Sequence, residues 1–153
     1  MPRSDDKQTL TGKVTPQDLE AERSLLGAIL RDESLFPDVL EKIGPNDFYD
    51  KKHATIFRAL KNIYDRNQSI DLVTARAELK NEGLLKEIGG AGYLAELTNS
   101  VPTTAHAISY ADLVEEASVR RRLIKAGTNI VEGAYDGGET VGELLGSAEN
   151  VLF

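Results

Sequence analysis

The longest uninterrupted helical pattern in the sequence runs from about Thr104 to Gly133 and contains no proline. About 30 residues rising about 1.5 Å each make a helix about 45 Å long, which is longer than a small core needs. Its apolar residues lie on two lines, the first through Tyr110, Val114, Ala117 and Ile124 and the second through Leu113, Leu123 and Ile130. A helix that is apolar on two sides usually has two neighbours. The pattern therefore predicts a long helix that extends beyond the core.

The residues that follow this helix predict that the chain turns back along it. Asp136-Gly137-Gly138 is typical of a tight turn, and Thr140 with Glu143 forms a capping box that starts another helix. Apolar residues then recur at helical spacing: Val141, Leu144, Leu145, Ala148, Val151 and Leu152. A helix of about 14 residues is marginal alone in water, so we expect residues 103–153 to form an antiparallel helical hairpin. The pattern still runs at Phe153, and we expect the natural protein to continue beyond it.

Residues 15–102 predict a globular helical subdomain, and the fold class is therefore all-α. Thr15-Pro16-Gln17-Asp18 carries helix-start signals, with Thr15 as the cap, for a first helix that ends near Arg31. A second helix is expected over residues 32–43, with Pro37 near its first turn and Gly44 in a left-handed closing conformation before Pro45. Asp50 and Asp71 are expected to cap two further helices, and Gly89-Gly90 to precede a short one. Residues 1–14 are polar and are expected to be a flexible tail.

Composition and charge narrow the functional class. The hydrophobic share is 41%, and it becomes about 46%, an ordinary value for a globular domain, when the 13 Gly replace the 5 Tyr in the tally. The 18 basic and 25 acidic residues give a net charge of −7, which counts against a domain that grips the phosphates of nucleic acid. The absence of cysteine excludes disulfides and thiolate metal sites. No apolar stretch approaches the length of a membrane span. These features indicate a soluble, cytoplasmic, acidic domain.

No motif predicts a catalytic, cofactor or metal site in this chain. Gly89-Gly90-Ala91-Gly92 lacks the lysine and hydroxyl of a phosphate-binding loop. Asp50 and His53 stand one helical turn apart, but a di-iron site needs that motif twice, so we favour a helix cap and a packed histidine. Arg120-Arg121-Arg122 with Lys125 is the one basic cluster. It is interpreted either as a charged helix surface or as a protein-docking patch.

The sequence resembles the N-terminal domain of bacterial replicative DNA helicases of the DnaB type. Thr15–Leu30 resembles the opening of that domain. The likeness continues in order through 47–57, 70–74, 89–97, 101–103, 110–111 and 121–124, and it covers nearly the whole chain. One departure is His106, where the family would carry Asn.

The resemblance implies a fold and a role. It implies a globular helical subdomain followed by a hairpin, in a collar on one face of a hexameric ring that is a trimer of dimers. The collar would contact primase and, in some systems, the helicase loader. The motor domain, which uses ATP and Mg and holds most of the DNA, would lie C-terminal to this segment. The chain would then be a non-catalytic part of a cytoplasmic enzyme that works at replication forks.

Two hypotheses concern particular residues of the predicted hairpin. The hairpin seam and dimer contact are assigned together, without division, to Leu113, Ala117, Leu123, Leu144, Ala148 and Val151. Partner docking is assigned to Arg120, Arg121, Arg122 and Glu143. Other classes stay open from the residues alone: a free-standing acidic helical adaptor without helicase activity, a small DNA-binding module and a helical metalloenzyme. The last two do not explain the matching blocks.

Overall fold

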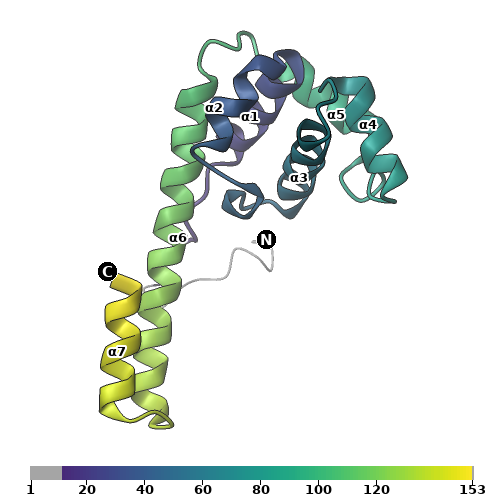
Figure 1. The fold of residues 1–153 in the computed structure, drawn as a ribbon. Helices are drawn as coiled ribbons and strands as arrows, with labels where there is room; N and C mark the ends of the chain where they lie inside the picture. The colour runs from purple at the N-terminus through teal and green to yellow at the C-terminus, as the bar shows by residue number, and fades with distance from the viewer. Residues whose placement is uncertain (1–11, 153) are drawn as a thin grey trace. The chain divides into compact units, whose positions relative to one another are not determined.

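The computed structural model describes residues 12–152 and is helical over that range, which confirms the all-α fold class. Its helices are α1 (Leu19–Arg31), α2 (Phe36–Leu40), α3 (Lys51–Asp65), α4 (Leu72–Asn81), α5 (Gly90–Ser100), α6 (Ala107–Asp136) and α7 (Val141–Leu152) (Figure 1). Two short 3-10 helices, Glu33–Leu35 and Pro45–Asp47, lie between them. Within the described range, no helix has the length and apolar character needed to cross a membrane.

The chain forms two compact units. The globular unit contains residues 17–118, and the hairpin unit contains residues 119–152 together with 12–16. Helix α6 continues from the first unit into the second, and its first part packs into the globular core through Ala107, Ala111 and Val114. The predicted tail, residues 1–14, lies outside the described residues except for its last three.

The core of the globular unit is built from the apolar stripes of α1, α3 and α5 together with smaller pieces. Leu25, Leu26 and Ile29 of α1 are fully buried, as their helical spacing requires. Helix α3 contributes Ile56, Phe57, Leu60 and Ile63, and α5 contributes Leu94 and Leu97. The Phe57 ring lies 5.3 Å from Phe36 and 5.0 Å from Phe48 between ring centroids. These aromatic pairs attach α2 and the segment before α3 to the core.

The first helix begins later than the sequence pattern predicts. Thr15 does not cap it; Asp18 does, because its carboxylate accepts a hydrogen bond from the Ala21 N–H at 2.9 Å. Pro16 therefore precedes the helix rather than occupying its first position. Asp is among the strongest N-cap residues because its charge also suits the positive end of the helix dipole. The predicted end at Arg31 is confirmed.

The expected second helix over 32–43 is shorter and interrupted. Asp32 caps the 3-10 helix by accepting from the Ser34 N–H at 3.1 Å, and α2 follows from Phe36 to Leu40. Pro37 stands in the first turn of α2, as predicted. Gly44 is extended, with φ −127° and ψ −178°, so the expected left-handed closure is wrong. Its N–H instead donates to the Asp47 carboxylate at 2.8 Å, which starts the 3-10 helix Pro45–Asp47.

The later helix boundaries follow the capping signals closely. Asp50 caps α3 by accepting from the Lys52 N–H at 3.0 Å, and Asp71 caps α4 by accepting from the Thr74 N–H at 2.9 Å. Gly89, with φ +104°, turns the chain into α5, in a conformation that glycine adopts without a Cβ penalty.

Helices α1 and α5 pack closely at Gly27. A Cβ atom on this residue would lie 2.1 Å from the Leu97 carbonyl oxygen and 2.7 Å from Val101 Cγ2. The absence of a side chain therefore lets the backbone of α1 pack against the end of α5. Arg31 continues this contact by donating to the Val101 carbonyl oxygen.

Within the hairpin unit, α7 lies antiparallel beside the second half of α6 (Figure 1). The predicted capping box starts α7: the Thr140 N–H donates to the Glu143 carboxylate at 3.3 Å, and the Glu143 N–H donates to the Thr140 hydroxyl at 3.2 Å. Gly137, with φ +67°, closes the turn. The reciprocal cap fixes where α7 begins and hence its register against α6.

Candidate interaction site

The two helices of the hairpin meet along a seam. A groove of about 320 Å³ runs along this seam. Its lining residues come from both helices and the turn: Ala126, Asn129, Ile130, Gly133, Asp136, Glu139, Leu144, Ser147 and Val151. The helices are close together at Gly133, where an added Cβ would lie 3.0 Å from Leu144 Cδ1. Leu144 therefore packs inward onto α6, and glycine at 133 makes room for it.

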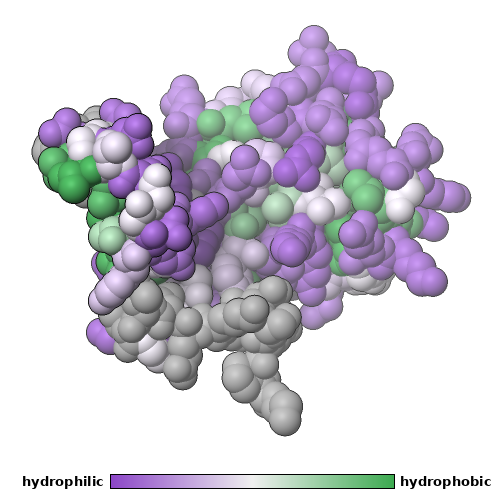
Figure 2. Space-filling model, turned by 90° about the horizontal axis from the view of Figure 1, so that it is seen from below, coloured by the Kyte–Doolittle hydropathy of each residue, from purple (hydrophilic) through white to green (hydrophobic). Residues whose placement is uncertain are grey.

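A second set of apolar residues remains exposed on the hairpin. We define the hairpin face as Leu123, Val131, Val141 and Leu145, which are all exposed large hydrophobic residues. Val141 is 74% exposed and Leu145 is 61% exposed. In Figure 2, where the closed end of the hairpin is nearest the viewer, hydrophobic residues are visible at its surface among hydrophilic ones.

Helical geometry places two of these residues, Val131 and Leu145, on one side of the hairpin. Val131 follows the seam residue Ile130 by one position, and Leu145 follows the seam residue Leu144 by one position. Each step turns the side chain by about 100° around its helix. Because the two helices are antiparallel, equal turns bring both stripes to the same side of the pair. Val131 and Leu145 thus share one side of the hairpin, and Val141 lies one turn before Leu145 on α7. Leu123 lies seven residues before Ile130 and therefore on nearly the same line of α6 as the seam, where it remains exposed.

The structure distributes the six residues predicted for the seam and dimer contact over several environments. Leu144 and Val151 line the seam groove, Leu123 lies on the hairpin face and Ala148 is half-buried. Leu113 and Ala117 belong to the globular unit. Leu113 is exposed there, beside a small pocket whose other lining residues are Asp18, Glu20, Ala21, Ser24 and Tyr110. The set predicted from the sequence does not include Val131, Val141 and Leu145, although the predicted helical repeat over 141–152 contains the last two.

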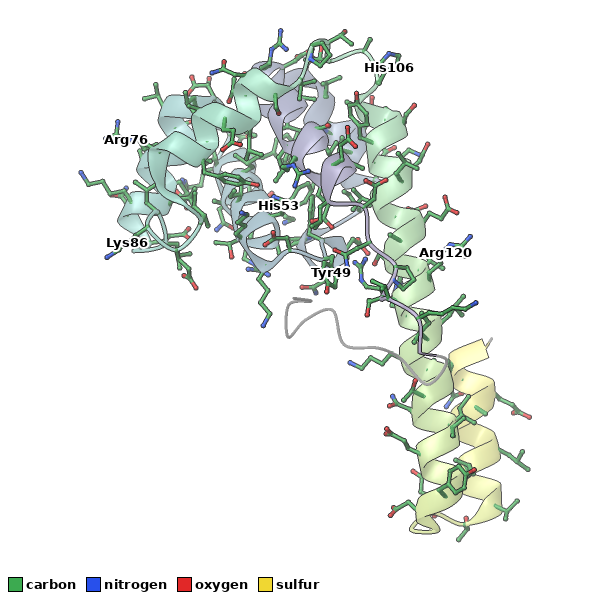
Figure 3. The ribbon with its side chains drawn as sticks, turned by 180° about the vertical axis from the view of Figure 1, so that it is seen from behind. Tyr49, His53, Arg76, Lys86, His106 and Arg120 are labelled. Atoms are coloured by element: carbon green, nitrogen blue, oxygen red, sulfur yellow. The ribbon has the colours of Figure 1, made fainter. Side chains whose placement is uncertain are left out.

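The four residues predicted for partner docking do not form one cluster. Arg120 and Arg122 are exposed on α6 (Figure 3 labels Arg120). Arg121 is half-buried, and its Nη1 donates to the Pro16 carbonyl oxygen at 3.0 Å. Glu143 belongs to the capping box at the closed end of the hairpin. Helix α6 runs about 21 Å from Arg122 to that end, at a rise of about 1.5 Å per residue.

The globular unit holds a buried polar cluster that no sequence motif predicts as a whole. The Glu22 carboxylate is 1% exposed and accepts three hydrogen bonds: from the Tyr49 N–H at 2.7 Å, the Asp50 N–H at 3.2 Å and His53 Nδ1 at 2.8 Å. His53 is 0% exposed, and its Nε2 lies 2.5 Å from the Tyr93 hydroxyl. Figure 3 shows His53 inside the unit, with Tyr49 nearby.

The hydrogen-bond directions in this cluster follow from the chemistry of its members. A carboxylate can only accept, so His53 Nδ1 carries the proton and Nε2 accepts from the Tyr93 hydroxyl. Burial, with a further contribution from Asp50, raises the pKa of Tyr93 to about 12, so its hydroxyl remains a donor. The Lys52 ammonium lies 4.2 Å from the centre of the same ring. The cluster therefore joins α1, α3 and α5 and satisfies every donor it buries.

A chain of carboxylate, imidazole and hydroxyl also occurs in hydrolases, but this one is built differently. A nucleophile must reach substrate and lose its proton readily. Here the raised pKa of Tyr93 opposes deprotonation, and both nitrogens of the fully buried His53 ring are occupied. Among the described residues, no group of three or more His, Cys, Asp or Glu side chains could hold a metal ion. The cluster thus acts as a structural clamp.

Two ion pairs at the surface of the globular unit add local connections. Arg66 after α3 donates to Glu78 of α4, and this contact holds the pKa of Glu78 below its usual value. The hydrogen bond to Glu78 raises the pKa of the neighbouring Glu82. The Lys42 ammonium lies 2.8 Å from the Asp112 carboxylate, whose hydrogen bond raises the pKa of Lys42. These pairs attach α4 to α3 and the start of α6 to the segment after α2.

Comparison with known proteins identifies similar chains. Residues 14–116 match the model of the family described as DnaB-like helicase N terminal domain. The replicative DNA helicase DnaC of Bacillus subtilis (strain 168) is 41% identical over 143 residues, which are 94% of this chain and 32% of that protein. The replicative DNA helicase DnaB of Mycobacterium leprae (strain TN) is 42% identical over 144 residues, which are 93% of this chain and 24% of that protein.

Solved structures show the same fold. The crystal structure of the N-terminal domain of DnaB helicase from Mycobacterium tuberculosis superposes with a TM-score of 0.85 at 43% identity, covering 90% of this chain and 98% of that one. A DnaB-like replicative helicase, described with its interactions with primase, gives a TM-score of 0.75 at 25% identity and covers 88% of this chain and 31% of that one. The chain thus spans about a quarter to a third of the length of the curated helicases it matches.

Proposed function

Because this chain belongs to the DnaB-like helicase N-terminal domain family, we propose that it is the N-terminal collar domain of a hexameric replicative DNA helicase. In that role it pairs subunits within the ring and binds primase, and in some systems a loader, during DNA replication. The unwinding motor lies elsewhere in the longer protein. The observation that carries the proposal is the hairpin face. It is an exposed apolar surface on the hairpin unit, which follows the globular unit in the sequence.

Pairing of two hairpins would remove this apolar surface from water. Fully burying an aliphatic side chain stabilises by about 1.5–3 kcal/mol. Because Val141 and Leu145 are mostly exposed in the single chain, most of this free energy would be gained only when a partner covers them. A two-fold contact counts each residue twice, since both copies present the same face. A second copy of the chain is therefore the simplest partner for the hairpin face.

The seam and the hairpin face divide the predicted contact set into two roles. We assign Leu144 and Val151, which line the seam groove, to the contact between α7 and α6, with Leu144 against Gly133. The half-buried Ala148 lies one turn after Leu144 and is assigned with them. Leu123, Val131, Val141 and Leu145 form the dimer contact. Leu113 and Ala117, on the globular part of α6, belong to neither hairpin surface and are left out of this proposal.

Primase is the second proposed partner, and the exposed arginines of α6 are its proposed contact. A solved DnaB-like replicative helicase is described with its interactions with primase, and Arg120 and Arg122 are the exposed arginines of the basic cluster on α6. Charged residues at the rim of an interface steer association and set its specificity. We leave Arg121 out of the contact because it bonds to Pro16, and Glu143 because it caps α7.

Charge reversal tests the primase proposal. Arg120→Glu with Arg122→Glu should weaken binding of the primase from the same cell at least about tenfold, or about 1.4 kcal/mol, in titration calorimetry. Arg76→Glu with Lys80→Glu makes the same charge change on exposed positions of α4 and should leave the affinity within about twofold of wild type. Equal primase affinity for all three chains would contradict the assignment of Arg120 and Arg122 to primase docking. Absence of binding by the wild-type chain would contradict the primase role itself.

ATP and Mg are proposed for the longer helicase and not for this chain. The sequence contains no G-x-x-x-x-G-K motif, whose backbone N–H groups and lysine would cradle the phosphates. The residues present therefore do not fit the nucleotide. We assign nucleotide hydrolysis and most of the DNA contact to the part of the helicase outside this segment.

A further inference from the structure

Arg121 differs from the arginines on either side of it. Its side chain is half-buried, and Nη1 donates to the backbone carbonyl oxygen of Pro16 at 3.0 Å across a sequence separation of 105 residues. Arg120 and Arg122 are exposed. A guanidinium remains charged at all physiological pH values, and a hydrogen bond from a charged donor is stronger than a neutral one. The contact therefore attaches the segment before α1 to α6.

This hydrogen bond occurs at a particular place in the chain. The polypeptide passes between its two compact units twice, at Pro16–Gln17 and at Ser118–Val119 within α6. Pro16 is the last residue before the first passage, and Arg121 lies within one helical turn after the second. The bond thus links the two passages within the hairpin unit.

We propose that the Arg121–Pro16 hydrogen bond is a latch that narrows the range of orientations the hairpin unit takes relative to the globular unit. A single helix between two bodies bends and twists about its own axis. Attachment at a second point removes part of that freedom. Arg121 is on this account a positioning residue for the hairpin, separate from the pairing and primase-binding surfaces proposed above.

The absence of cysteine from the chain allows a direct test. Lys80→Cys on α4 and Asn150→Cys on α7 introduce one spin label in each unit at exposed positions. Electron–electron distance measurements on this doubly labelled chain, diluted in unlabelled protein, report the spread of distances within one molecule. Adding Arg121→Gln should broaden the distribution at least about twofold, as expected for release of a hinge restraint. Arg122→Gln is the matched control and should leave it unchanged.

A second readout separates release of the segment from general unfolding. Lys13 precedes Pro16 in the attached segment, and trypsin cleavage after Lys13 should become about tenfold faster in Arg121→Gln, the factor that corresponds to about 1.4 kcal/mol. Cleavage at sites within α1 to α5 should not change. Broader distances together with faster cleavage after Lys13 support the latch. An unchanged distance distribution, or a broader one without faster cleavage after Lys13, overturns it.

Discussion

Replacement of Glu22 by alanine is expected to lower the free energy of unfolding by about 3–5 kcal/mol, because it removes the buried acceptor that three donors share. The substitution would leave His53 Nδ1 and the N–H groups of Tyr49 and Asp50 without their acceptor in the interior. An unsatisfied buried donor costs about 1–3 kcal/mol. The same change also loosens the start of α3, because Asp50 is its N-cap.

Urea unfolding of the whole chain measures this effect, with Glu20→Ala as the control. Glu20 lies on the same helix but is exposed, so its replacement should change the free energy of unfolding by no more than about 0.5 kcal/mol. Glu22→Gln should fall between the two, since an amide keeps one acceptor oxygen but adds a donor group. Equal stability of the Glu22→Ala and Glu20→Ala chains would contradict the structural role of the buried cluster of Glu22, His53 and Tyr93.

Gly27→Ala is expected to destabilise the globular unit by a net amount of up to about 2 kcal/mol. The new Cβ would lie 2.1 Å from the Leu97 carbonyl oxygen, a backbone atom that can move only if α1 and α5 separate. Overpacking of this kind costs about 1–3 kcal/mol and occasionally more. Alanine also favours a helix interior by about 1 kcal/mol over glycine, and we expect the steric cost to exceed this gain.

Gly92→Ala is the matched control for this prediction. Gly92 lies in α5 of the same unit, and an added Cβ there would meet nothing within 4 Å. Only the propensity gain applies, so thermal or urea unfolding should show about 0.5–1 kcal/mol of stabilisation. Opposite signs for the two substitutions are the expected result. If Gly27→Ala also stabilises the chain, the close helix contact is wrong.

The parts of the fold that sequence patterns predict well are those with a local physical cause. The Thr140–Glu143 capping box and the Asp50 and Asp71 caps need only residues three or four positions apart. The hairpin itself follows from a long helix, a glycine turn and a second amphipathic repeat. The similar helicases confirm the resemblance that the matching blocks indicate.

The features that the sequence patterns did not predict have two causes. Either two residues compete for the same hydrogen bond, or the partner is distant in the sequence. Thr15 and Asp18 both suit an N-cap, and the stronger acceptor caps α1. Gly44 is extended because Asp47 captures its N–H, which the Gly-Pro pattern does not reveal. Glu22 lies at helical spacing within the apolar stripe of Leu25, Leu26 and Ile29, so its burial was detectable. Its partners His53 and Tyr93 could not be identified without the fold.

The division of the hairpin into seam and exposed face also required the structure. The repeat over 141–152 contains Leu144 and Leu145 as neighbours, and only the contact with Gly133 shows which of them faces α6. The role of Arg121 was likewise hidden, because Pro16 is 105 residues away in sequence. Helical periodicity identifies which residues are apolar but not which of two neighbours a distant element covers.

Sedimentation of the chain and two variants across a range of concentrations tests most directly whether the hairpin face pairs subunits. Leu145→Asp changes a residue on that face, and Asn150→Asp places the same side chain at another exposed position of α7. Each dimer buries Leu145 twice, so at least about 3 kcal/mol is lost and the dissociation constant should rise at least about 100-fold. The Asn150→Asp chain should associate like the wild type. Equal association of the Leu145→Asp chain and the wild type, or a wild-type chain that stays monomeric at every concentration, would contradict the account.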